Sequence, residues 1–310
     1  LKSLEALGAE IITEGNYYRA LAPHGLHGTN VNLRYPSVGA TENTILAAVL
    51  AKGKTVIENA AVEPEVIDLI KLLQNMGAII ELGANRRICI EGVNHLHGSE
   101  YKILPDRNEA VSFACLAVAT NGNIFVREAV QEHLITFLNT LRRIGGEYEV
   151  LENGIRFWRT NKLKGLNIET DTHPGFMTDW QQPLLVVLTQ SEGDSLIHET
   201  VYEDRFHYTQ DLNLMGARIK VENECRGILP CRFKNLKHPH SARISGPTEL
   251  QPAKIKVPDL RAGIAHLIAT LTARGESTIY GIEEIDRGYE HIDERLRSIG
   301  AGIKRMEPNQ

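Results

Sequence analysis

Two arginines stand at matching positions in the chain and mark the first place where anion chemistry is expected. Arg205 lies 12 residues after Gly193, Arg287 lies 12 residues after Gly275, and an aspartate precedes each arginine. Both are predicted where a strand is followed by a helix, so a guanidinium and the backbone N–H groups of a helix N-terminus would together favour a phosphate or carboxylate. Taken alone, the pattern fits surface ion pairs at least as well.

A further candidate is the aspartate in the segment DTHPGFMTDWQQP. The segment places Pro174, Gly175, Thr178 and Asp179 at the start of an apolar helix. Asp179 is there either as a helix N-cap, which stabilises a helix by about 1 kcal/mol, or as a general base that reaches a substrate hydroxyl while nearby arginine keeps it ionised. The residues alone leave both roles open.

Two other helix starts carry residues suited to a phosphorylated substrate. KVPDLRAG supplies Asp259 and Arg261, and LRYPSVGATEN supplies Ser37, Val38 and Gly39, whose backbone donors would suit a diphosphate. The patterns GxxxxGK[ST] and GxGxxG occur nowhere in the chain, so neither an ATP-type phosphate loop nor a dinucleotide fingerprint is present. ATP and NAD are therefore not expected as ligands.

The histidines and cysteines near the end of the chain give only a weak metal signal. Cys225, Cys231, His238 and His240 form the pattern C-x5-C-x6-H-x-H, which departs from the usual spacings of zinc ligands. We expect an ordinary loop there, and no metal or organic cofactor.

Composition restricts the class of protein. The chain has 310 residues, a net charge of -5, 42% apolar and 24% charged residues, so no global positive field exists for nucleic acid or an anionic membrane. No apolar run approaches the roughly 20 residues of a membrane span, and no signal peptide is evident, which predicts a soluble, cytoplasmic protein. Cys89 and Cys115 are expected in a strand and an apolar helix, as small hydrophobes.

A short sequence pattern, or phrase, recurs five times along the chain, for example as LEALGAEI and LQNMGAII. Each copy reads as the end of an amphipathic helix, then a glycine, then a strand. The glycines lie 69, 68, 71 and 84 residues apart, and each is predicted to adopt a left-handed backbone that ends its helix. These periods are longer than the 20 to 50 residues of most solenoid repeats. The five glycines are Gly8, Gly77, Gly145, Gly216 and Gly300.

A second phrase, a glycine turn and then a strand, begins at Gly53, Gly122, Gly193 and Gly275. Sixteen residues before three of these glycines stand good N-cap residues, each opening an apolar helix. The three caps are Ser37, Asp106 and Asp259. One unit therefore reads as strand, helix, strand, helix, strand, strand, with only the first copy lacking its opening half. Helices this apolar must be buried, so sheets are expected to surround them.

Six motifs in order over nearly the whole chain carry a family resemblance: PSVGATEN, LPDRNEA, PGFMTDWQQ, VYEDRF, VPDLRAG and IDRGYEHID. They resemble those of the UDP-N-acetylglucosamine 1-carboxyvinyltransferases, which are enolpyruvyl transferases. The resemblance implies a two-lobed inside-out α/β barrel of βαβαββ units. Residues 1–103 would be the later part of the first lobe, residues 104–310 would be the second lobe with three units, and the active site would lie between the lobes.

The resemblance also implies a reaction and the residues that carry it. The enolpyruvyl group of phosphoenolpyruvate would pass to the 3'-hydroxyl of UDP-N-acetylglucosamine through a tetrahedral intermediate, the first committed step of peptidoglycan synthesis. Asp179 would be the base, Arg261 and Arg287 would bind phosphoenolpyruvate, and Arg205 and Asp259 would complete the charged wall. The residues that would contact the nucleotide sugar are Ser37, Val38, Gly39, Thr178, Val201 and Tyr202.

Parts of the family pattern are missing from the chain. Residue 1 falls inside a predicted helix over residues 1–7, and the family's early Lys-Asn pair, loop cysteine and further arginine would lie upstream of it. We therefore expect an N-terminally truncated chain with little turnover alone. The alternatives are a shikimate-pathway enolpyruvyl transferase with the same fold and chemistry, and a non-catalytic remnant that keeps the fold.

Overall fold

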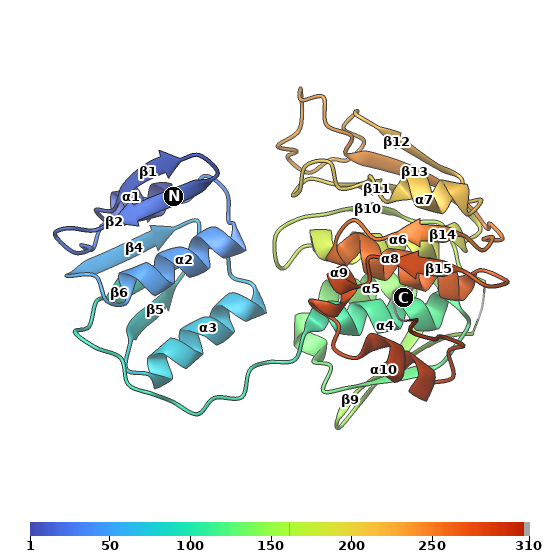
Figure 1. The fold of residues 1–310 in the computed structure, drawn as a ribbon, viewed down its shortest axis with the longest axis horizontal. Helices are drawn as coiled ribbons and strands as arrows, with labels where there is room; N and C mark the ends of the chain where they lie inside the picture. The colour runs from blue at the N-terminus through green and yellow to red at the C-terminus, as the bar shows by residue number, and fades with distance from the viewer. Residues whose placement is uncertain (161, 307–310) are drawn as a thin grey trace. The chain divides into compact units, whose positions relative to one another are not determined.

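The computed structural model describes residues 1–160 and 162–306 and divides into two compact units, residues 1–104 (unit 1) and residues 105–310 (unit 2) (Figure 1). Each unit has its own buried apolar core. Among the described residues, no helix combines the length and the apolar character that crossing a bilayer requires.

Unit 1 contains one complete repeat preceded by the second half of another. Its elements are α1 (Lys2–Ala6), β1 (Glu10–Glu14), β2 (Tyr17–Leu21), β3 (Asn30–Asn32), α2 (Val38–Ala48), β4 (Lys54–Glu58), α3 (Pro64–Asn75), β5 (Ile79–Gly83) and β6 (Arg87–Glu91). The predicted helix at the chain start is confirmed as α1.

Unit 2 contains three further repeats. The first consists of α4 (Arg107–Ala119), β7 (Ile124–Arg127), η1 (Gln131–His133), α5 (Ile135–Ile144), β8 (Gly146–Leu151) and β9 (Gly154–Arg159). The second consists of β10 (Asn167–Glu169), η2 (Thr178–Trp180), α6 (Gln181–Thr189), β11 (Gly193–His198), α7 (Thr209–Leu214), β12 (Ile219–Glu222) and β13 (Ser241–Gly246). The third consists of β14 (Lys254–Lys256), α8 (Leu260–Thr272), β15 (Thr278–Tyr280), α9 (Glu283–Asp286) and α10 (Ile292–Ser298).

Every sheet is all or part of one four-stranded pattern, which confirms the repeat. The two complete sheets have the orders β3-β4-β6-β5 and β10-β11-β13-β12, with the first pair parallel and the others antiparallel. Corresponding residues pair in both, Val31 with Ile57 and Ile168 with Ile197. The remaining sheets, β7-β9-β8, β14-β15 and β1-β2, are subsets of the same order.

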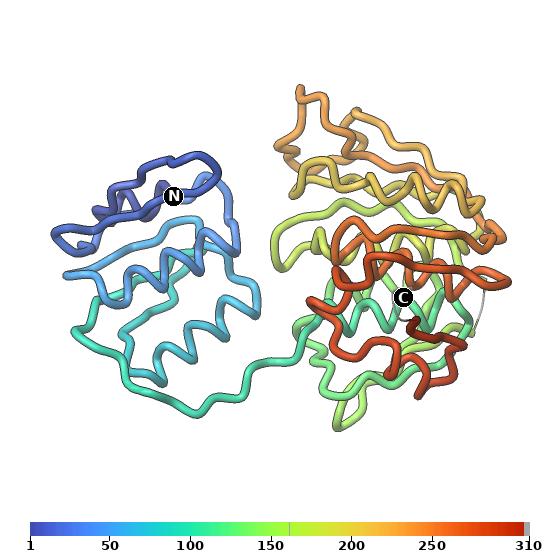
Figure 2. The backbone as a smooth tube through the Cα atoms, in the orientation of Figure 1, coloured from blue at the N-terminus to red at the C-terminus, as the bar shows by residue number. Residues whose placement is uncertain are grey.

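The repeats are less uniform than predicted. The first repeat of unit 2 has no opening strand, since residues 101–106 are irregular, and the last has no closing hairpin within the described residues up to 306. The longest period also has a single cause: residues 223–240 separate β12 from β13, whereas only residues 84–86 separate β5 from β6. Residues 223–240, which we call the insertion, form the long loop that joins the paired strands β12 and β13 (Figure 2).

Glycine ends the helices as the phrase predicts. The five phrase glycines all have a left-handed backbone with φ between +96° and +100°, where a side chain would be strained. One glycine of the second phrase differs: the left-handed residue of that turn is Asn121, with φ +56°, rather than Gly122. Asparagine tolerates this conformation better than most residues.

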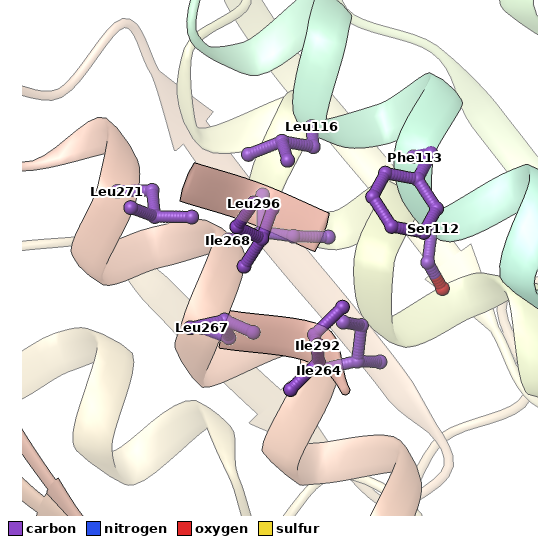
Figure 3. A pocket seen from close by; sticks show the side chains of 9 residues that line it. All are labelled: Ser112, Phe113, Leu116, Ile264, Leu267, Ile268, Leu271, Ile292 and Leu296. Carbon is purple, nitrogen blue, oxygen red and sulfur yellow. The ribbon is translucent and has the colours of Figure 1, made fainter. Parts of the chain in front are cut away.

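Three apolar helices form the interior of unit 2, with strands around them (Figure 1). α4, α6 and α8 pack on one another, and all nine residues of α6 are buried. A small apolar pocket remains where α4 and α8 meet α10, and it is a packing gap rather than a polar site (Figure 3). Its lining is Ser112, Phe113, Leu116, Ile264, Leu267, Ile268, Leu271, Ile292 and Leu296. The burial predicted for the capped apolar helices is confirmed for α4 and α8, but it is wrong for α2, which is buried on one face only and leaves Leu46 exposed.

Candidate active site

The N-terminal ends of the three interior helices meet in unit 2. Asp106 caps α4 by accepting the Asn108 N–H at 2.7 Å, and the Trp180 indole, just before α6, donates to the Asn108 side chain at 2.9 Å. Asp259 caps α8 by accepting the backbone N–H groups of Arg261 and Ala262. Because each helix N-terminus carries partial positive charge, this end of the core attracts anions.

Asp179 lies between two arginines at this end. Its Oδ1 is 2.5 Å from Arg205 Nη2 and its Oδ2 is 3.1 Å from Arg261 Nε. The arginine side chains are only 13% and 18% exposed, against 29% for the aspartate. The carboxylate therefore faces guanidinium groups, and the 3-10 turn and α6 begin without a side-chain cap. Of the two roles left open by the sequence, the capping role is wrong.

Two neighbours fix the position of Arg205: Tyr202, for which the sequence predicted a different role, and Gln182, for which it predicted none. Its guanidinium lies 4.4 Å from the centre of the Tyr202 ring, a favourable cation–π distance. The side-chain amide of Gln182 accepts a hydrogen bond from Arg205 at 3.2 Å and donates to the Thr178 carbonyl at 3.1 Å when its oxygen faces the guanidinium. The residues Thr178 and Tyr202, both predicted substrate contacts, are thus joined to Arg205.

Glu199 is the principal structural residue behind this surface, and sequence patterns did not reveal it. The fully buried carboxylate accepts hydrogen bonds from the Thr170 hydroxyl, from the backbone N–H groups of Val201 and Tyr202, and from the Thr178 hydroxyl, at 2.7 to 3.0 Å. Burial raises the pKa of Glu199, although these donors oppose the shift. A single side chain therefore positions three of the predicted substrate contacts.

The charged residues around α8 influence one another. A hydrogen bond from His207, at 3.1 Å, lowers the pKa of Asp259 to about 2, and the Ala262 N–H assists. The same contact raises the pKa of His207. Burial alone would lower the pKa of Arg261, but nearby negative groups, led by Asp179, raise it above its ordinary value. Arg261 consequently stays charged although its side chain is largely buried.

Arg287 differs from the sequence expectation in its surroundings. It is the C-cap residue of the short helix α9, so its own backbone lies at a negative helix end rather than the expected positive one. Its side chain is 69% exposed and pairs with Glu284 at 2.7 Å. The backbone nevertheless runs beside the start of α8, because a side chain at Gly288 would press against Leu260. Arg287 is therefore near the cluster in the fold but is not bonded to Asp179.

The predicted nucleotide contacts Ser37, Val38 and Gly39 open α2 in unit 1. The Ser37 hydroxyl accepts the Ala40 N–H at 3.4 Å, as an N-cap should. Gly39 is exposed, and a side chain there would meet open space. This turn leaves backbone groups accessible at a helix N-terminus, where phosphate oxygens bind well.

Comparison with known proteins first defines the class. A family model described as EPSP synthase (3-phosphoshikimate 1-carboxyvinyltransferase) matches residues 1–296. The structure of the enolpyruvyl transferase NikO from Streptomyces tendae matches with a TM-score of 0.85 over 98% of this chain and 71% of that one, at 22% identity. EPSP synthase from Acinetobacter baumannii gives 0.68 at 18% identity, over 97% and 69%. The fold is that of the enolpyruvyl transferases, as predicted.

Closer relatives narrow the family. The UDP-N-acetylglucosamine 1-carboxyvinyltransferase of Protochlamydia amoebophila is 49% identical over 99% of this chain and 67% of its own length. That of Chlamydia trachomatis serovar D is 49% identical over 98% and 69%. The chain spans about two thirds of the length of these relatives. It belongs to the family of UDP-N-acetylglucosamine 1-carboxyvinyltransferases.

Proposed function

We propose that the protein transfers the enolpyruvyl group of phosphoenolpyruvate to the 3'-hydroxyl of UDP-N-acetylglucosamine, as the names of its relatives indicate. The observation that carries the proposal is the placement of Asp179 between Arg205 and Arg261 where three helix N-termini meet. A carboxylate for proton transfer and guanidiniums for an anion are the groups this reaction needs.

The binding of phosphoenolpyruvate would rearrange the ion pairs of Asp179. Its phosphate and carboxylate compete for Arg205 and Arg261, and each guanidinium has further N–H donors to offer. The carboxylate of Asp179 is then released from part of its pairing and can accept a proton. This order of events allows the base to become available only when the donor substrate is in place.

The reaction then follows from these positions. As the 3'-oxygen adds to C2 of phosphoenolpyruvate, Asp179 accepts the hydroxyl proton, and a proton is added to C3 to give a tetrahedral intermediate. Loss of a C3 proton and of inorganic phosphate restores the carbon–carbon double bond. Arg205, Arg261 and Arg287 would stabilise the negative charge of the phosphate and carboxylate throughout.

Two sets of residues are proposed to contact the nucleotide sugar. Ser37, Val38 and Gly39 present the N-terminus of α2, which suits the diphosphate. Val201 and Tyr202, with their backbone fixed by Glu199, would contact the uridine sugar side. Asp259 caps the N-terminus of α8 and accepts the backbone N–H of Arg261, which fixes the backbone that carries this arginine.

The cellular setting follows from the same proposal. The reaction is the first committed step of peptidoglycan synthesis, and its substrates are small molecules rather than nucleic acid or membrane. We propose a cytoplasmic location for the protein, with roles in cell wall formation, cell shape and division.

The test measures phosphate release from phosphoenolpyruvate with UDP-N-acetylglucosamine as acceptor, beside calorimetric titration of the nucleotide sugar. In a chain extended to the full length of its relatives, we expect acceptor-dependent release that Asp179→Asn abolishes, and binding that this variant retains. The 310-residue chain alone should show little release. Release with 3-phosphoshikimate and none with UDP-N-acetylglucosamine would support the shikimate-pathway alternative instead. Neither release nor nucleotide-sugar binding would identify a non-catalytic relative and overturn the proposal.

A further inference from the structure

A cluster of two cysteines and two histidines lies at the end of β11, where His198 directly precedes Glu199. His198 ends β11, while Cys225, Cys231 and His240 belong to the insertion. The four candidate ligand atoms all lie within 4.8 Å of one another. The sequence pattern pointed to His238 as the fourth member, but the strand residue His198 occupies that place.

The ring of His240 is oriented as metal-bound histidines are. Its Nδ1 lies 2.6 Å from the His238 carbonyl oxygen, which can only accept, so Nδ1 carries the proton. The lone pair of Nε2 then faces Cys225, whose Sγ is 3.3 Å away. A backbone carbonyl that fixes the tautomer of one nitrogen while the other faces a thiol is the arrangement found around metal-ligating histidines.

His198 lacks the partners that a buried imidazole needs. Its side chain is fully buried, and within the described residues neither ring nitrogen has a hydrogen-bond partner. Its Nδ1 is 3.4 Å from Glu169 Oε2, at the edge of ion-pair distance. A buried polar atom without a partner costs about 1 to 3 kcal/mol, so the cluster as it stands is incomplete.

The backbone of the insertion is shaped around the same point. Glu169 accepts the N–H groups of Ile228 and Leu229 at 2.8 and 2.9 Å, which holds the insertion against the strand. A side chain at Gly227 would overlap Glu169 and His198. The loop therefore passes directly over the histidine, and glycine is required there.

We propose that His198, Cys225, Cys231 and His240 bind one Zn²⁺. Two thiolates and two imidazoles are a ligand set that zinc prefers, and in a tetrahedral site the ligand atoms would be about 3.3 to 3.8 Å apart. The cluster needs only small side-chain movements to reach these distances. Four protein ligands leave no open position, so the ion is structural, and its binding releases the thiol protons to solvent.

The ion would fix the insertion next to the proposed substrate surface. His198 directly precedes Glu199, and Arg232 of the insertion donates to the Val201 carbonyl at 3.1 Å and pairs with Glu203 at 3.1 Å. Tying the insertion to β11 therefore restrains the turn that carries Val201 and Tyr202. This structural role goes beyond the proposed function and does not depend on it.

Zinc content of the full protein, purified without chelator, tests the proposal independently of activity. We expect about one zinc per chain by plasma mass spectrometry, and less than about a fifth of that in Cys225→Ser and Cys231→Ser. The matched controls His238→Ala and Cys89→Ser should keep the metal. Equal loss in His238→Ala and Cys231→Ser, or a wild-type chain that stays metal-free after incubation with zinc chloride, would overturn the site.

Two measurements keep the test decisive if the cysteine variants fold poorly. Wild-type protein stripped with a chelator should melt at least about 4 °C lower and recover when zinc is returned. Substitution with Co²⁺ should give the absorption of thiolate-bound tetrahedral cobalt. A disulfide between Cys225 and Cys231 in the intact mass, or no cobalt spectrum, would show that the cysteines serve another purpose and the proposal fails.

Discussion

Arg205 and Arg287 each lie in the turn, or corner, that follows the second strand of their repeat. The two corners occupy the same position in successive repeats but have different surroundings. Arg205 is largely enclosed and pairs with Asp179, from the helix start of its own repeat. Arg287 is exposed and pairs with Glu284, while the helix start of its repeat, Asp259, is engaged by His207. The repeat therefore sets the backbone position of each arginine, whereas the neighbouring elements determine which carboxylate its side chain pairs with.

Removing the charge of Asp179 tests the role of the Arg205 corner most directly. In a chain extended to the full length of its relatives, Asp179→Asn should lower turnover about 100-fold or more with a modest change in affinity for UDP-N-acetylglucosamine, because the proton acceptor is lost while the binding surface remains. Steady-state kinetics and calorimetry measure the two effects, with Asp204→Asn, an exposed neighbour, as the control. Parallel losses of binding and melting temperature would instead indicate a structural role.

Replacing each arginine by alanine should distinguish the contributions of Arg205 and Arg287 to stability and to substrate binding. Arg205→Ala should destabilise the fold by about 1 to 3 kcal/mol and also raise the KM for phosphoenolpyruvate, because Asp179 loses one of its two guanidinium partners and Gln182 loses the donor to its amide oxygen. Arg287→Ala should raise that KM while changing stability by less than about 0.5 kcal/mol, since its pair is exposed. Urea unfolding and kinetics check both; equal destabilisation by the two variants would contradict the comparison.

The Arg205 corner also depends on the buried carboxylate beneath it. Glu199→Ala should destabilise the protein by about 2 kcal/mol and weaken nucleotide-sugar binding, because the N–H groups of Val201 and Tyr202 lose their acceptor. Glu199→Gln keeps an acceptor oxygen and the side-chain shape, so it should retain most of the stability. An alanine variant that melts like the wild type would remove Glu199 from this role.

The smallest expected effect is the pH dependence of the contact between His207 and Asp259. The pKa of His207 is raised, so its stabilisation is full below about 6.5 and is lost as pH rises through the folded value. The pKa of Asp259 is lowered to about 2, so its part is full above about 4 and is lost as pH falls through that value.

The two signs place the full stabilisation between about pH 4 and 6.5. Because both side chains are nearly half exposed, solvent screening keeps it below about 1 kcal/mol. The unfolding free energy of His207→Asn should therefore differ from that of the wild type at pH 5.5 and converge with it at pH 8.5. A difference that is the same at both pH values would mean that the ion pair contributes nothing.

The parts of the fold that were predictable from sequence are those set by local chemistry. Ser37, Asp106 and Asp259 cap helices because a side-chain oxygen can reach N–H groups two or three residues ahead. The glycine stops follow in the same way from the left-handed backbone. These features need no knowledge of distant residues, so the repeat could be found before the structure.

The parts that were not predictable depend on packing between segments far apart in the chain. Glu199 lies outside the six motifs, and Gln182 ends one of them with no role predicted for it; the importance of both comes from donors on other elements. His198 precedes Cys225 by 27 residues, so no spacing rule would join them. The expected helix end beneath Arg287 is wrong for a similar reason, since the chain inserts the short helix α9 at that point.

The complete burial of α6 has a consequence for the cooperativity of unit 2. The helix is covered because α4 and α8, from the repeats on either side in the sequence, pack against it. A single repeat by itself would present such a helix to water, which is unfavourable for a segment this apolar. The three repeats of unit 2 are therefore expected to unfold together in one cooperative transition rather than one at a time.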